Sequence, residues 1–285
     1  MYPDCMNTIR EKVKPERDLN NIKFRREKWW QFAASAPALY TAIAGMKRAL
    51  VTAIITTYFA PIFHPINEVY SHKCCVFSIE DWCSYAVIQT NIHEAWTRHY
   101  SSSLKTWLNY SPSDCFETFP FPTNLNCLED IGERYYTHRQ SIMLARQEGL
   151  TKMYNRFHDP KEKAADIVKL RELHREMDEA VTKTYGWDDL KLEHGFHETK
   201  QGLRYTISEA ARREVLDRLL LLNHQRHEEE VKAGLFEKKG AKGKGKGNLG
   251  KTDDWNRDIE RIGRNDGARV QVEAISGDVE QETLF

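Results

Sequence analysis

The feature that most constrains the fold is a change of hydrophobic pattern at Pro120 and Pro122. Before these prolines, β-branched and aromatic runs at Leu50–Tyr58 and Cys74–Ile79 flank a turn-forming stretch, which is typical of short strands. After them, apolar residues recur at helical spacing up to about residue 232, which is typical of amphipathic helices. The sequence therefore predicts an α+β fold, with a small mixed sheet and helices followed by an all-helical domain.

The second part is expected to contain three long helices, over residues 125–147, 161–185 and 207–231. In the second of them, one apolar stripe is formed by Ile167, Leu170, Leu173, Met177 and Val181. Thr206 and Glu209 have the spacing of a capping box at the start of the third. The histidines of these helices have many charged neighbours and are expected to be exposed or capping: His174, His224 and His227.

The first part opens on a cationic stretch, Arg10–Lys28, with eight Lys or Arg residues and four Asp or Glu residues. Helix formers follow over Ala33–Gly45, so this opening is expected to be largely helical. Further along, Ser78 and Asp81 can cap a helix that runs through Trp96.

Three segments follow from these patterns: residues 1–122, a mixed part with the small sheet; residues 123–236, a helical domain; and residues 237–285, a tail. The tail begins with alternating Lys and Gly and continues with polar residues. Such a composition cannot bury enough apolar surface to order a chain, so the tail is expected to be flexible.

Composition describes an ordinary globular chain, with 40% hydrophobic and 29% charged residues and a formal net charge of zero. No apolar run reaches the ~20 residues of a spanning helix, and no secretory signal is visible. Six cysteines without a CxxC pair suit free thiols in a reducing compartment, which we expect to be the cytoplasm.

The sequence lacks the signatures of several kinds of catalytic site. The closely spaced glycines, Gly243, Gly245 and Gly247, have no flanking strand, and no Pro-Pro pair is present. The His and Cys residues between 64 and 83 match no zinc spacing. Asp189, Glu198 and Lys200 faintly resemble a nuclease metal site, but 187–204 is expected to be a loop between helices.

Recognition is the class of function that remains. Residues 96–112 combine phosphate donors, base-edge hydrogen bonders and aromatic rings, which suits nucleic-acid binding. The alternative interpretation of this stretch is a hydroxyl-rich loop whose aromatic side chains face the core.

Three motif blocks resemble the C-terminal region of type II (type IIG/IIL-like) restriction-modification enzymes with a fused adenine-specific DNA methyltransferase. Val13–Arg17 and Arg26–Phe32, with Pro37–Tyr40, resemble the segment after their catalytic domain. Ser111–Pro122 resembles the block that closes their target-recognition domain, and Gly149–Pro160 resembles the helical region beyond.

The resemblance implies that residues 1–122 are a target-recognition-like DNA-binding domain and that the chain recognises a specific sequence in double-stranded DNA. It places the S-adenosylmethionine site and the catalytic loop on a separate catalytic domain or chain, so no catalytic residue and no metal ligand is assigned here. The candidate DNA-contacting residues are Arg25, Arg26, Lys28, Arg98, Ser101, Ser102, Ser103 and Lys105. The alternatives are a helical module that docks a catalytic subunit, and a gene fragment without function.

Overall fold

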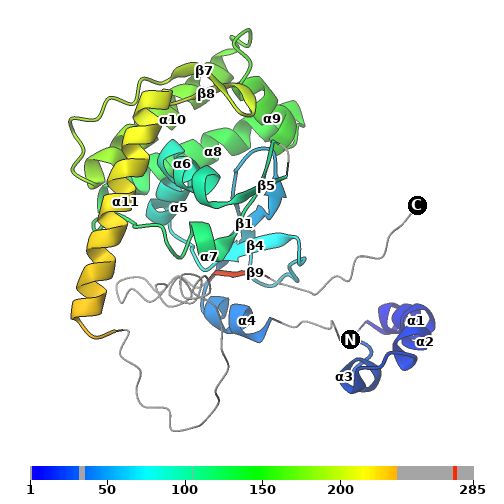
Figure 1. The fold of residues 1–285 in the computed structure, drawn as a ribbon. Helices are drawn as coiled ribbons and strands as arrows, with labels where there is room; N and C mark the ends of the chain where they lie inside the picture. The colour runs from blue at the N-terminus through cyan, green and yellow to red at the C-terminus, as the bar shows by residue number, and fades with distance from the viewer. Residues whose placement is uncertain (1, 32–35, 105, 236–271, 275–285) are drawn as a thin grey trace.

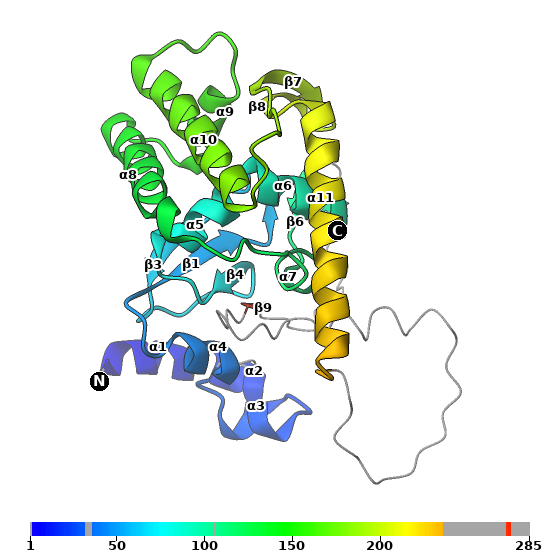
Figure 2. The same ribbon diagram turned by 90° about the vertical axis from the view of Figure 1, so that its left-hand side faces the viewer.

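The computed structural model describes residues 2–31, 36–104, 106–235 and 272–274, and Figures 1 and 2 show its ribbon from two directions. Helices and small antiparallel sheets alternate along the chain, which confirms the predicted α+β class. The elements are α1 (Pro3–Lys12), α2 (Lys14–Asp18), α3 (Lys23–Glu27), α4 (Pro37–Ile43), β1 (Arg48–Ala53), β2 (Ile55–Thr56), β3 (Ile62–Pro65), β4 (Cys74–Phe77), α5 (Trp82–Gln89), α6 (Asn91–Tyr100), β5 (Ser102–Leu104), β6 (Trp107–Asn109), α7 (Pro112–Cys115), η1 (Asn126–Leu128), α8 (Glu129–Arg146), α9 (Leu150–Phe157), α10 (Ala165–Thr184), β7 (Gly195–Thr199), β8 (Gly202–Thr206), α11 (Glu209–Lys232) and β9 (Val272–Ala274).

The main sheet has the strand order β3-β1-β4-β9 and separates two apolar clusters. Because successive side chains of a strand point to opposite faces, β1 sends Leu50 into the large core and Ala49 and Val51 to the other face. On that other face they pack with Leu39 and Ile43 of α4. Figure 2 shows α4 below the sheet and α5 and α6 above it. Burial on both faces explains why β1 is a continuous apolar run.

The predicted helix from Asp81 through Trp96 is two helices, because Thr90 interrupts it. The backbone of Thr90 is extended, and its hydroxyl donates to the carbonyl of Val87 while accepting from the N–H of His93. A Thr side chain that bonds nearby backbone groups competes with helix continuation. Asp81 caps α5 as predicted, with Oδ1 accepting from the N–H of Ser84 at 2.7 Å.

The helical part shares its core with the first part. Tyr85 and Ile88 of α5 belong to the same buried cluster as Tyr135 of α8 and Leu170 and Met177 of α10. The 122/123 boundary predicted from the prolines therefore does not separate two cores. It follows a change of local pattern within one packed body.

The prediction of an all-helical second part is wrong at residues 195–206. There β7 and β8 form an antiparallel hairpin, in the stretch that was expected to be a loop. The capping box is also corrected, since the N-cap of α11 is Ser208, whose hydroxyl accepts from the N–H of Ala211 at 3.1 Å. The hydroxyl of Thr206 instead donates to Asn91 at 2.8 Å.

The tail predicted as flexible, residues 237–285, lies outside the described residues except for β9. This strand pairs with β4, with Val76 opposite Glu273. All six cysteines are free. In the part of the chain that the structure describes, no helix has the length and apolar character needed to span a membrane.

Candidate nucleic-acid interface

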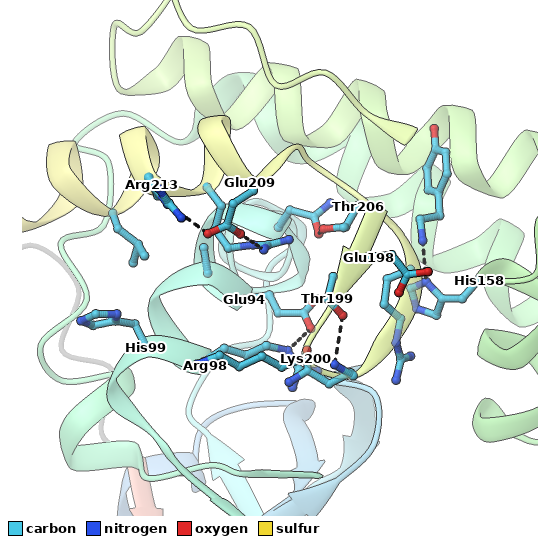
Figure 3. A pocket seen from close by; sticks show the side chains of 17 residues that line it. Glu94, Arg98, His99, His158, Glu198, Thr199, Lys200, Thr206, Glu209 and Arg213 are labelled. Carbon is cyan, nitrogen blue, oxygen red and sulfur yellow. Dashed lines mark hydrogen bonds and ion pairs between the residues drawn. The ribbon is translucent and has the colours of Figure 1, made fainter. Parts of the chain in front are cut away.

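A pocket of about 560 Å³ opens between α6, the β7–β8 hairpin and the start of α11 (Figure 3). Cationic side chains outnumber carboxylates in its lining, which favours an anionic ligand. We call it the basic pocket. Its charged lining residues are five cations, Arg98, Lys200, Arg204, Arg212 and Arg213, and three glutamates, Glu94, Glu198 and Glu209.

Arg98 is held at the pocket by two contacts. Its Nε donates to Glu94, one helical turn earlier, at 2.6 Å, and its Nη2 donates to the carbonyl of Thr57 at 3.4 Å. Burial raises the pKa of Glu94, but the neighbouring Arg98 outweighs it and holds that pKa below its usual value. The pair is thus charged, and the side chain of Arg98 keeps 21% of its surface exposed.

The first turn of α6 is fixed by a buried network behind the pocket. Asp178 of α10 accepts from the backbone N–H and from Nδ2 of Asn91, at 2.9 and 2.7 Å, and lies 2.7 Å from His194. His174, which was expected to be exposed or capping, is buried beside Asp178 instead. A single-sequence pattern missed this, because the rings that pack on His174, those of Tyr135 and Phe157, lie on α8 and α9. His224 is exposed and His227 is half-buried.

The β7–β8 hairpin is held from the α9 side. The N–H of Tyr205 donates to Nδ1 of His158 at 3.1 Å, and burial, helped by Arg204, lowers the pKa of His158 to about 3. Arg171 of α10 donates to four backbone carbonyls around the end of α9, those of Phe157, Glu162, Arg156 and Asp159. Its guanidinium also lies 5.0 Å from the ring of Phe196 on β7. The hairpin is therefore anchored to the helical core.

The predicted contact residues that follow Arg98 form the start of the β5–β6 hairpin. The hydroxyl of Ser101 lies 2.7 Å from the sulfur of Cys115 and accepts from the N–H of Ser111. Ser102 accepts from Nδ2 of Asn109 at 2.8 Å. The hydroxyl of Ser101 thus makes its contacts within the protein. Ser103 lies on β5, but its side chain is outside what the structure describes, and so is Lys105 altogether.

The other predicted contact residues are not brought to this pocket. Arg25 and Arg26 lie on α3, and Lys28 follows it. Arg26 donates to the carbonyl of Asn20 at 2.6 Å, while the Lys28 ammonium lies 6.0 Å from the ring of Phe24. In both views α1–α3 lie beyond α4, at the end of the molecule opposite the β7–β8 hairpin (Figures 1 and 2).

The residues considered for a nuclease site are not assembled. Glu198 and Lys200 line the basic pocket, whereas Asp189 is not among its lining residues and pairs with Arg218 at 2.6 Å. Among the described residues, no group of three or more His, Cys, Asp or Glu side chains is placed to hold a metal ion.

Four pocket cations, Lys200, Arg204, Arg212 and Arg213, were missed from the sequence. Lys200 and Arg204 lie on the β7–β8 hairpin, for which the sequence predicts a loop. The sequence does hold a signal, since the polar run 200–202 ends in a glycine and stands between two short runs with aromatic residues. In the structure Gly202 closes the turn with a φ of +91°. Nothing in the sequence indicates that the two arginines of α11 line a pocket, because their pattern is that of the solvent-exposed face of a helix.

Comparison with known proteins finds a family match for the first part of the chain. Residues 6–123 match the family model of the MmeI target recognition domain. No curated protein matches the chain. A solved chain described as the type IIL restriction-modification enzyme MmeI in complex with DNA aligns with a TM-score of 0.48 and 16% identity, over 77% of this chain and 26% of that one. This chain thus spans about a quarter of that protein's length. The resemblance predicted from the motifs is confirmed for residues 6–123, which match the MmeI target recognition domain.

Proposed function

We propose that this chain recognises a specific sequence in double-stranded DNA, as the specificity part of an adenine-N6 methyltransferase or restriction-modification system of the cytoplasm. Catalysis and S-adenosylmethionine binding belong, in this proposal, to a separate methyltransferase domain or chain. A methyltransferase must extrude its target adenine, and a recognition part sets which adenine is presented.

The family match over residues 6–123 carries this proposal. The matched segment contains α6 and the β5–β6 hairpin, and α6 delivers Arg98 to the basic pocket. A duplex offers regularly spaced phosphates, so a cationic pocket beside a short hairpin suits a surface that grips the backbone and reads bases nearby. Arg98 is our candidate base reader, and Arg25, Arg26 and Lys28 are candidate phosphate contacts.

Duplex binding by the full chain, measured by fluorescence anisotropy at increasing KCl, tests the proposal. We expect log Kd to rise linearly with log salt, because phosphate contacts release counterions. Arg98→Ala should cost ~1 to 3 kcal/mol on a recognised sequence and much less on others. The matched control is Arg175→Ala, since Arg175 is exposed on α10 and outside the pocket. A parent chain without salt-dependent binding contradicts the proposal.

A docking module is the second candidate function, and α11 supplies the observation that favours it. Beyond Leu219 the helix leaves the core, and Leu221 and Val231 are 60% and 51% exposed. Exposed apolar side chains on one helix suit contact with a catalytic chain. Leu221→Glu should then abolish capture of a methyltransferase chain while leaving duplex affinity unchanged. Loss of duplex binding in Leu221→Glu would instead place α11 at the DNA.

A further inference from the structure

One cation of the basic pocket differs from the rest in its surroundings. Arg204 of β8 lies over the ring of Tyr58, with its guanidinium carbon 4.4 Å from the ring centroid. Tyr58 is itself stacked on His158, at 5.2 Å between ring centroids, and its hydroxyl donates to Asn155 at 2.7 Å. The guanidinium therefore rests on a platform that is fixed from behind.

Among the residues that the structure describes, none accepts a hydrogen bond from the guanidinium of Arg204. Within the described part of the chain, no carboxylate lies within 4.0 Å of its guanidinium and no hydrogen bond from it is formed. By contrast, Arg98 pairs with Glu94, while Arg212 and Arg213 both pair with Glu209. Arg204 is half-buried, and burial lowers its pKa. Glu94 acts on this charge electrostatically, but from beyond ion-pair distance. A partly desolvated guanidinium without a direct partner costs free energy, so this position suits an arginine that meets its anion from outside.

Two further features suit the same ligand. Lys200, at the turn of the hairpin, is exposed, lines the same pocket and has no ion pair among the described residues. Figure 3 shows Arg98 at the same edge of the pocket as Lys200. Glu198 is the lining carboxylate without a cation partner in the described chain, but it is exposed and free to turn towards water.

We propose that Arg204, with Lys200 beside it, forms an oxyanion site for a phosphate group, which is a phosphodiester of the DNA backbone. A guanidinium that stacks on an aromatic ring presents its N–H edge in a plane, and this geometry matches two oxygens of a phosphate. The DNA assignment rests on the proposed function. Lys200 and Arg204 lie outside residues 6–123, whereas the platform residue Tyr58 lies inside them, so the β7–β8 hairpin extends the recognition surface beyond the matched segment.

The first arm of the test observes Arg204 directly with inorganic phosphate. In the full chain with ¹⁵N-labelled arginine, the Nε–Hε signal that disappears in Arg204→Gln is followed while phosphate replaces chloride at constant ionic strength. We expect a saturable shift of that signal, retained in the control Arg175→Gln. A signal that responds neither to phosphate nor to a DNA duplex overturns the proposal.

The second arm measures duplex affinity against salt. Arg204→Gln should weaken binding to every duplex alike and lower the salt slope by ~1, whereas Arg204→Lys should keep the slope but not the full affinity. If the parent binds DNA and Arg204→Gln binds with the same slope, the phosphate site is wrong and the proposed function stands. If Arg204→Gln weakens binding to one DNA sequence only, the phosphate site is also wrong, and Arg204 reads a base instead. If phosphate shifts Arg204 but the parent binds no duplex, the oxyanion site stands and the DNA function fails.

Discussion

Asp178 of α10 holds the first turn of α6 by accepting two hydrogen bonds from Asn91, at 2.9 Å from its backbone N–H and 2.7 Å from its side chain. Asn91 in turn accepts from Thr206 of β8 at 2.8 Å. One buried carboxylate thus ties together the helix that carries Arg98 and the hairpin that carries Arg204.

Asp178→Asn should lower the free energy of unfolding by about 3 kcal/mol. The amide keeps the volume but replaces an acceptor oxygen with a donor that faces the donors of Asn91 and His194 in a fully buried site. Urea denaturation followed by circular dichroism measures the change. Asp217→Asn, on the exposed face of α11, is the control and should change stability by less than ~0.5 kcal/mol. Equal stabilities for the two variants would contradict the assigned role.

Stability should fall as the pH drops below about 6.5. Burial lowers the pKa of His93 and of His158 to about 3, and it lowers the pKa of His174 as well. The unfolded chain therefore binds more protons than the folded one below the ordinary histidine pKa of 6.5, so the stabilisation present above that pH is lost on acidification. Each such histidine contributes a slope of ~1.4 kcal/mol per pH unit between the two pKa values.

His93→Gln should reduce this slope by the contribution of one histidine, ~1.4 kcal/mol per pH unit. Chemical denaturation between pH 4 and pH 8 measures it. A parent chain whose stability does not depend on pH in this range would show that these histidines are protonated in the fold.

Gly132→Ala should destabilise the protein by ~1 to 3 kcal/mol, although alanine is the better helix former. A Cβ at Gly132 would collide with the backbone carbonyl oxygen of Trp82, where α8 crosses α5. At Gly149, just before α9, a Cβ meets nothing within 4 Å, so Gly149→Ala is the matched control. Thermal unfolding compares the two, and a more stable Gly132→Ala variant would refute the close crossing.

The sequence allowed the fold class to be predicted because period and composition are local properties. The β1 and β4 runs, the Asp81 cap and the α8, α10 and α11 helices were all expected from such patterns. The hairpin was missed because β7 and β8 are short, and their stability comes from tertiary contacts such as Tyr205 with His158. Propensity alone does not register partners that lie 47 residues apart along the chain.

The candidate site was predictable only in part, for the same reason. Arg98 lies in the stretch 96–112, whose phosphate donors and aromatic rings indicate nucleic-acid binding, and the structure places it in the basic pocket. Arg204 reaches that pocket through pairing of β7 with β8, and its platform Tyr58 comes from the loop after β2. No spacing in the sequence indicates that these residues meet.

Purified alone, the chain should not bind S-adenosylmethionine, because it has neither the glycine-rich turn after a strand nor a Pro-Pro catalytic loop. Isothermal titration calorimetry with the methyl donor measures this, and duplex DNA provides the positive control. Adding a methyltransferase chain of the same system should restore adenine methylation. Saturable binding of the methyl donor by the chain alone would show that it carries a catalytic site of its own.

The central claim is that the chain distinguishes one DNA sequence from others, and a ratio of two dissociation constants tests it most directly. Binding-site selection from a random duplex library identifies the preferred sequence, and Kd is then measured for that duplex and for a scrambled duplex of equal composition at one salt concentration. We predict a ratio of ~10³ or more, as expected of specific recognition. A ratio near one, or a selection that enriches no sequence, would contradict the account.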